Sequence, residues 1–221
     1  MSARTIVAAL VGRLAGRRSA AWAVRLTAAA VAGLLVLAAC YLPTRFQADV
    51  TYNVNGDWSL TFDGTLAYGG LIPGLMPDNP TPAQLAERVK SVTNDMMRDP
   101  GFTSVQYLNN GQYQVAYART GNIYTQTGIT FLRTDSRILQ ISYIKTSNQI
   151  WIRGTTVPTA QRKWITDAGL TMQGDVRITT AAPVLEHNAT STRSAANGAT
   201  TYIWAIRGVD APGAKLIIQG R

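Results

Sequence analysis

The chain has 221 residues and a formal net charge of +9, from 21 basic and 12 acidic side chains. Five basic side chains and no acidic ones lie in the first 25 residues, which leaves a net charge of +4 for residues 41–221. This mild charge is not typical of nucleic-acid binding, although it suits anionic lipid headgroups or acidic glycans. Cys40 is the single cysteine, so a disulfide within the chain is excluded.

The first 39 residues have the pattern of a lipoprotein signal peptide. An arginine-rich start is followed by an apolar run from Leu26 to Ala39, interrupted by Thr27. Residues 37–40 read Leu-Ala-Ala-Cys, a bacterial lipobox with an aliphatic residue at −3, small residues at −2 and −1, and cysteine at +1. The pattern predicts cleavage between Ala39 and Cys40. The Cys40 thiol would then carry a diacylglyceryl group with fatty acids such as palmitate.

An uncleaved anchor helix is the alternative for this region. Residues 26–42 contain no charge, but they number 17, and a bilayer span needs about 20 apolar residues. In either case the N-terminal arginines place the residues after Cys40 outside the cytoplasm, in the cell envelope. Tyr41 is not the aspartate that retains lipoproteins in the inner membrane of many Gram-negative bacteria. We therefore expect the outer membrane if the cell is Gram-negative; the membrane leaflet stays open.

After the anchor, we expect a lipidated tether at 40–46 and one domain at 47–221. Apolar and polar residues alternate from Phe46 to Val54, which is typical of a half-buried strand. The dipeptide Asn55-Gly56 then predicts a hairpin, with a return strand from Trp58.

A glycine- and proline-rich segment follows, and it carries the apolar residues Leu71, Ile72, Leu75 and Met76. One interpretation is a loop that contacts a ligand, a membrane or a partner. The other is a loop that folds back onto the apolar stripe of the next helix.

Residues 82–98 are predicted to form the principal helix, which is amphipathic. Thr81 and Gln84 have the spacing of a capping box, with Pro82 at the first helical position. Leu85 and later apolar residues recur at helical spacing, and a turn at 99–101 ends the helix.

The remaining chain reads as strands, apart from a short helix near 158–168. The sequence therefore predicts a β-rich α+β domain: a curved antiparallel sheet with one face covered by the principal helix. We expect the tryptophans after the anchor to be core residues. The strands are expected near 105–108, 113–117, 128–133, 137–145, 149–153, 171–180, 183–187, 200–207 and 214–219.

Sequence signals for an enzyme are sparse. One histidine and one cysteine exclude a His/Cys metal cluster, and no nucleotide-binding or nucleophile motif is present. We therefore expect no enzymatic activity, no cofactor and no metal. A hydrolase that uses Asp57, Asp63 and His187 stays an open alternative.

The C-terminal third has a recognisable order: GDVRITTAAPVLEHNAT, then NGATTYIWAIRG, then AKLIIQG. Together with the lipobox and the early strand bearing FDGTLA, this resembles the LppM-type domain of bacterial lipoproteins. The resemblance implies an exported, lipid-anchored domain without established enzymatic activity that contacts lipids or glycolipids of the envelope. Many relatives carry a transmembrane helix after the domain. This sequence shows no such segment after its last predicted strand, so Cys40 is expected to be the sole anchor.

Three functions follow as hypotheses. The first is a membrane-anchored binding or carrier module with an apolar pocket between sheet and helix, and with Leu71, Ile72, Leu75 and Met76 at its mouth. The second is an assembly lipoprotein that binds another envelope protein. The third is the hydrolase.

Overall fold

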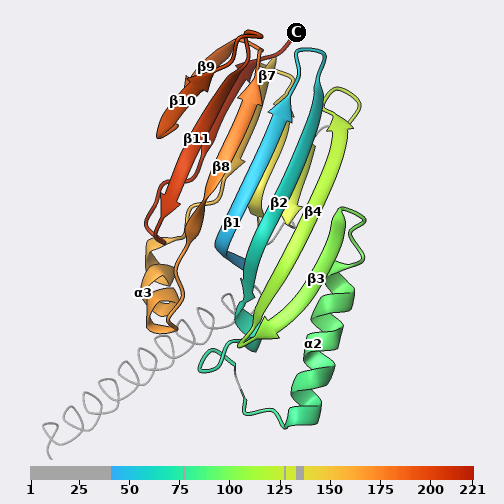
Figure 1. The fold of residues 1–221 in the computed structure, drawn as a ribbon, viewed down its shortest axis with the longest axis vertical. Helices are drawn as coiled ribbons and strands as arrows, with labels where there is room; N and C mark the ends of the chain where they lie inside the picture. Colours follow the sequence, from blue (N-terminus) through green and yellow to red (C-terminus); the bar gives the residue numbers. More distant parts are fainter. Residues whose placement is uncertain (1–40, 77, 127, 133–136) are drawn as a thin grey trace, which may run out of the picture. The chain divides into compact units, whose positions relative to one another are not determined.

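The computed structural model describes residues 41–76, 78–126, 128–132 and 137–221 (Figure 1). Strands dominate these ranges and two α-helices accompany them, so the predicted β-rich α+β class is confirmed. The predicted signal peptide, the predicted cleavage position at Ala39 and the predicted lipidation of Cys40 lie outside the described residues. Within the described ranges, no helix combines the length and the hydropathy that crossing a bilayer requires.

The strands form two sheets rather than one. The large sheet has the strand order β10-β11-β8-β1-β2-β4-β3. Its members are β1 (Tyr41–Tyr52), β2 (Asp57–Tyr68), β3 (Phe102–Asn109), β4 (Gln112–Asn122), β8 (Gln173–Thr180), β10 (Ser191–Ser194) and β11 (Thr200–Arg207). Most pairs are antiparallel, but β1 and β8 run parallel.

The small sheet has the order β5-β6-β7-β12-β9. Its members are β5 (Gly128–Leu132), β6 (Arg137–Ile144), β7 (Gln149–Gly154), β9 (Val184–His187) and β12 (Lys215–Gln219). All of its pairs are antiparallel. Consecutive β5, β6 and β7 form the predicted meander, whereas β12 joins them from the end of the chain.

The core lies between these sheets. Alternation along β1 buries Ala48, Val50 and Tyr52, as a strand with one solvated face requires. Phe131 of the small sheet lies 4.9 Å from Phe62 and 4.5 Å from Tyr117 of the large sheet, measured between ring centroids. Aromatic packing thus joins the two sheets.

The expected tether is part of the fold. β1 begins at Tyr41, which pairs with Tyr68 of β2, so residues 41–46 are strand and not a flexible link. Pro43 concealed this in the sequence because proline cannot donate to a sheet ladder. The structure accommodates it at a register shift between Pro43 and Arg45. β1 therefore already includes Tyr41, the first residue that the structure describes.

The principal helix is α2 (Pro82–Met96), which confirms the predicted start. Thr81 Oγ1 accepts the Gln84 backbone N–H at 3.4 Å, and Gln84 Oε1 accepts that of Thr81 at 2.8 Å, which completes the capping box. The helix packs beside β3 and the short 3₁₀ turn η1 (Gly69–Leu71), at the edge of the large sheet (Figure 1). Met96 is its buried residue.

The tryptophans divide between core and surface. Trp58 and Trp204 are each 2% exposed, as expected for core residues. Trp151 is half-buried and stacks under Arg153. Trp164 is 46% exposed, so the prediction of a core position is wrong for this residue. It lies on the short helix α3 (Thr159–Asp167), which buries the neighbouring Ile165 instead.

Candidate functional site: an apolar cavity between the sheets

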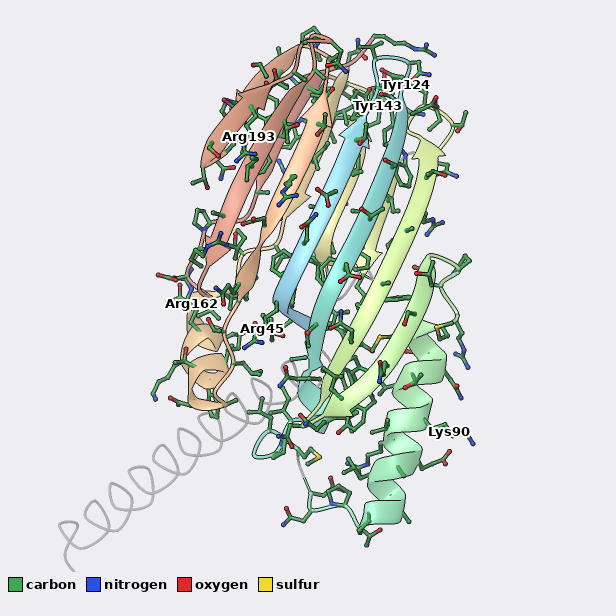
Figure 2. All side chains as sticks on the ribbon, in the orientation of Figure 1. Arg45, Lys90, Tyr124, Tyr143, Arg162 and Arg193 are labelled. Atoms are coloured by element: carbon green, nitrogen blue, oxygen red, sulfur yellow. The ribbon has the colours of Figure 1, made fainter. Side chains whose placement is uncertain are left out.

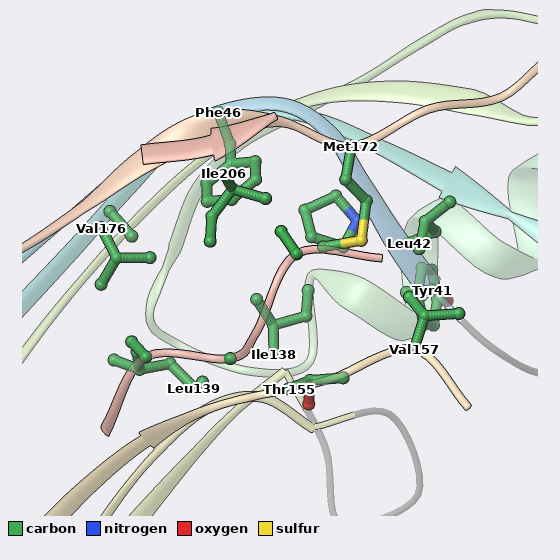
Figure 3. Close-up of a pocket in the computed structure, with 16 residues that line it drawn as sticks. Tyr41, Leu42, Phe46, Ile138, Leu139, Thr155, Val157, Met172, Val176 and Ile206 are labelled. Atoms are coloured by element: carbon green, nitrogen blue, oxygen red, sulfur yellow. The ribbon is translucent and has the colours of Figure 1, made fainter. Parts of the chain in front are cut away.

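An apolar cavity lies between the two sheets. Figure 3 shows side chains of the large sheet on one side and of the small sheet on the other, with connecting segments closing the space. Residues that form its wall include Phe46, Val176 and Ile206 of the large sheet, Ile138 and Leu139 of the small sheet, and Val157 and Met172 next to α3. Almost all of these side chains are hydrocarbon, so the cavity suits an apolar group and offers little to a polar one.

The cavity has a volume of about 50 Å³. An apolar cavity of about 150 Å³ admits benzene, so the space as it stands fits only a very small apolar group. An acyl chain could enter only if part of the wall moved.

Part of the wall lies outside the sheet ladders. Residues 155–172 connect β7 to β8 and include α3, whose N-cap residue Pro158 makes no side-chain capping bond. Gly213 N–H donates to Thr156 Oγ1 at 3.1 Å and Thr155 N–H donates to the Ile138 carbonyl at 2.9 Å, and these bonds tie the start of the segment to the rest of the fold. Arg162 Nε–H donates to the Val157 carbonyl at 3.1 Å within the segment. Sheet ladders hold the strands of the opposite wall, whereas this connecting segment has no ladder of its own.

The first residues of the described chain also line the cavity. Tyr41, Leu42 and Pro43 contribute to the wall, and the Tyr41 ring packs 4.9 Å from that of Tyr68. Thr44 is buried and donates to the Thr65 carbonyl at 3.3 Å, which fixes this end of β1. Since Cys40 directly precedes Tyr41 in the sequence, the predicted lipidation position adjoins the cavity wall.

The apolar loop residues singled out in the sequence lie elsewhere. Leu71 and Ile72 are 2% and 5% exposed, and their backbone approaches Gly111 in the β3–β4 turn so closely that a Cβ there would clash. Leu75 and Met76 are half-buried. None of the four lines the cavity, so the pocket lies between sheets and not between sheet and α2. Their contact with a ligand or membrane stays a prediction.

The candidate hydrolase residues are spread over the fold. Asp57 and Asp63 are six residues apart on β2, about 20 Å along the strand. Two carboxyl groups that flank one glycosidic bond lie about 5–10 Å apart. His187 ends β9, in the other sheet, where its Nδ1 accepts the Ala189 N–H at 3.2 Å. This arrangement does not assemble the two carboxylates into one glycosidase site.

Hydrogen bonding explains the electrostatics of Asp57. Asn122 and Asn55 donate to its carboxylate at 2.8 and 2.7 Å, and these bonds lower the pKa of Asp57 below its usual value. The site is a turn that ties β2 to the end of β4. In the described ranges, no group of three or more His, Cys, Asp and Glu side chains is placed to hold a metal ion.

Sequence reasoning missed a shallow polar depression on the outer face of the large sheet. Strand pairing sets Gln47 opposite Asp63, with Asp49, Thr61 and Thr103 around them. Arg177 lies 3.9 Å from Asp49 and compensates part of its charge. The alternation of β1 and β2 predicts that these side chains face solvent, but the register that groups them is not visible in the sequence.

The chain resembles a solved structure, although its sequence matches no family model. No family model matches the chain, and no curated protein matches it. Among solved structures, the chain is similar to the NMR structure of the folded domain of the Mycobacterium tuberculosis LppM protein, with 13% identity and a TM-score of 0.41. The match covers 80% of this chain and 90% of that one. At this level of similarity the LppM-type family stays a prediction from the sequence, and no function is transferred.

Proposed function

We propose that the chain is an exported lipoprotein, anchored through Cys40, that serves as a non-enzymatic binding or carrier module for lipid or glycolipid in the cell envelope. The observation that carries this proposal is the apolar cavity, whose wall begins at Tyr41. A lipid chain at Cys40 would hold this part of the cavity wall beside the bilayer.

The chemistry of the wall favours an acyl chain over a polar ligand. Burial of apolar surface contributes about 25 cal/mol per Å², whereas a polar group placed there without a hydrogen-bond partner is penalised. Anchoring adds a second advantage, because a ligand that is itself in the bilayer is presented at high effective concentration.

The cavity volume of about 50 Å³ makes binding dependent on a change of shape. We propose that the segment 155–172 moves outward when a chain enters and returns when it leaves. A small apolar cavity is consistent with a carrier that closes between loads.

Replacing Ala48 tests this proposal. Ala48 lines the cavity and is 2% exposed, so Ala48→Leu places additional methyl groups in the cavity. The full chain is purified from membranes, extracted with organic solvent and analysed for lipids by mass spectrometry. We expect stoichiometric lipid with the wild type and at least a tenfold loss with Ala48→Leu.

Ala118→Leu is the matched control, since Ala118 is exposed on the outer face of β4. It should retain wild-type lipid. Equal lipid in the two variants, or none in the wild type, would exclude the cavity as a lipid site. Circular dichroism of both variants separates loss of binding from loss of fold.

An assembly role is the second candidate. β10 is an edge strand of the large sheet, and all four of its residues are exposed. An exposed edge can pair with a strand of another protein. Crosslinking in intact membranes from position Arg193 tests this role: a single envelope protein captured there supports it, and recovery of the uncoupled chain alone excludes it.

A further inference from the structure

α3 presents an exposed aromatic side chain at the end of the domain where β1 begins. Trp164 is 46% exposed, although the helix buries the adjacent Ile165. A tryptophan left on the surface is suited to a membrane interface, where its ring contacts apolar chains and its N–H stays hydrated.

The position of α3 relative to the N-terminal end follows from the cavity wall. Val157 and Met172, which flank the helix, line the cavity together with Tyr41. β1 pairs with β8 in parallel register, so Arg45 lies opposite Gln173, one residue after Met172. α3, the start of β1 and the position next to Cys40 therefore belong to one end of the domain.

Two cations at this end form no ion pair with another residue that the structure describes. Among the described residues, the ion pairs leave out both Arg45 and Arg162, and Figure 2 places both side chains at the end that carries α3. Arg45 is exposed, and Arg162 is half-buried with Nε bonded to the Val157 carbonyl.

Nearby acidic groups are largely compensated. Asp167 pairs with Lys163 at 2.7 Å, and Asp175 pairs with Arg207 at 2.9 Å. Asp210, in the loop after β11, offsets part of the remaining positive charge. An excess of basic side chains next to an exposed tryptophan is complementary to a surface of anionic lipid.

We infer that this end of the domain docks on an anionic bilayer, with the Trp164 indole among the headgroups and Arg45 and Arg162 bound to lipid phosphates. The inference rests on the proposed lipid anchor, which brings the surface to the membrane. Docking adds an orientation: the segment 155–172, which must move for the cavity to open, faces the source of the ligand.

Cysteine accessibility in vesicles tests the docked orientation. The full chain is reconstituted into phosphatidylcholine vesicles with about a third of phosphatidylglycerol. Ala160→Cys is the reporter, because Ala160 is exposed and lies one helical turn from Trp164 on the same face. Val54→Cys is the control: Val54 is 58% exposed in the β1–β2 turn, at the opposite end of β1 from Tyr41, and the 12 residues of β1 span about 40 Å.

We expect a membrane-impermeant maleimide to label Ala160→Cys at least tenfold more slowly than Val54→Cys in these vesicles, and equally fast in detergent. Adding Trp164→Gln, or Arg45→Gln with Arg162→Gln, to the reporter should restore fast labelling. Each cation near an anionic surface strengthens binding about fivefold, so vesicles of phosphatidylcholine alone should also restore it.

Maleimide labelling of the wild type tests the proposed anchor independently of the docked orientation. Its Cys40 is the single native thiol, so labelling of the wild type shows a free thiol and contradicts the lipid anchor. If the wild type is unlabelled and membrane-bound, but Ala160→Cys and Val54→Cys react at the same rate in anionic vesicles, the docked orientation is wrong while the anchor stands. Protection of Ala160→Cys that survives in phosphatidylcholine vesicles, or that Trp164→Gln leaves intact, overturns docking through these side chains.

Discussion

The indole N–H of Trp204 donates to Asn188 Oδ1 at 2.6 Å, and the same oxygen accepts the Lys215 backbone N–H at 2.8 Å. Trp204 belongs to the large sheet and Lys215 to the small one. Asn188 Nδ2 also donates to the Gly213 carbonyl at 3.0 Å. One amide side chain thus joins the two sheets next to the loop that lines the cavity.

Replacing Asn188 should therefore weaken the contact between the sheets. Asn188→Ala leaves the buried Trp204 indole without its acceptor, and we expect a loss of about 1–3 kcal/mol in the free energy of unfolding. Urea denaturation measures it. The control is Asn94→Ala on the exposed side of α2, which should change stability by less than about 0.5 kcal/mol. Equal effects of the two changes would show that the bridge contributes nothing.

The two buried tryptophans should respond differently to replacement by phenylalanine. Both are 2% exposed, but the Trp58 indole nitrogen is buried with no hydrogen-bond partner among the described atoms. Trp58→Phe removes this unsatisfied group, whereas Trp204→Phe breaks the bond to Asn188. We expect Trp204→Phe to cost about 1–2 kcal/mol more than Trp58→Phe in urea denaturation. A larger loss of unfolding free energy with Trp58→Phe would show that the hydrogen bond to Asn188 does not distinguish the two tryptophans.

The capping box of α2 should control local opening of that helix. Thr81→Ala removes the side-chain acceptor for the Gln84 N–H, a change that costs about 0.5–2 kcal/mol in helices. We expect faster amide hydrogen exchange in the first turns of α2 and unchanged exchange in β1. Ser91→Ala, an exposed position of the same helix, is the control and should leave both unchanged. Uniform acceleration across the sheets would show that the cap acts on global stability instead.

The pKa of Asp57 gives a prediction in acid. It is lowered from 3.8 mainly by the Asn122 hydrogen bond and then by that of Asn55. A carboxyl group whose pKa is lower in the folded state contributes stability above its unfolded pKa, and this contribution is lost as the pH falls through the folded-state value.

Asn122→Ala should therefore raise the pKa of Asp57 toward 3.8, so that the β1–β2 turn loosens at a higher pH than in the wild type. Carboxyl chemical shifts during an NMR titration measure the pKa of Asp57 in the wild type and in Asn122→Ala. An unchanged pKa in Asn122→Ala would assign the shift to another cause.

Local patterns in the sequence predicted the elements better than their arrangement. Thr81, Pro82 and Gln84 form the expected cap because a capping box depends only on neighbouring residues. At Asn110 and Gly111, φ angles of 45° and 73° match a turn that asparagine and glycine favour, so that hairpin was predictable too. The strand expected at 200–207 is β11 itself.

The cavity depends on pairings that leave no local signal. β1 lies parallel to β8, more than 120 residues later in the sequence, and this brings Phe46 to Val176 in one wall. The division into two sheets has the same origin, since strand periodicity gives the buried face but not the neighbour. The sequence also could not show that Trp164 is exposed, because a nine-residue helix with one buried position carries little pattern.

We propose above all that a lipid on Cys40 holds the domain at the membrane, next in sequence to Tyr41 of the cavity wall. Trypsin cleaves after Arg25 and Arg45, so mass spectrometry of denatured protein purified from membranes distinguishes the forms directly. We expect the peptide 40–45 with a diacylglyceryl group and fatty acids on Cys40. An unmodified peptide 26–45 would show that the leader is retained and the thiol is free, and would contradict the lipid anchor.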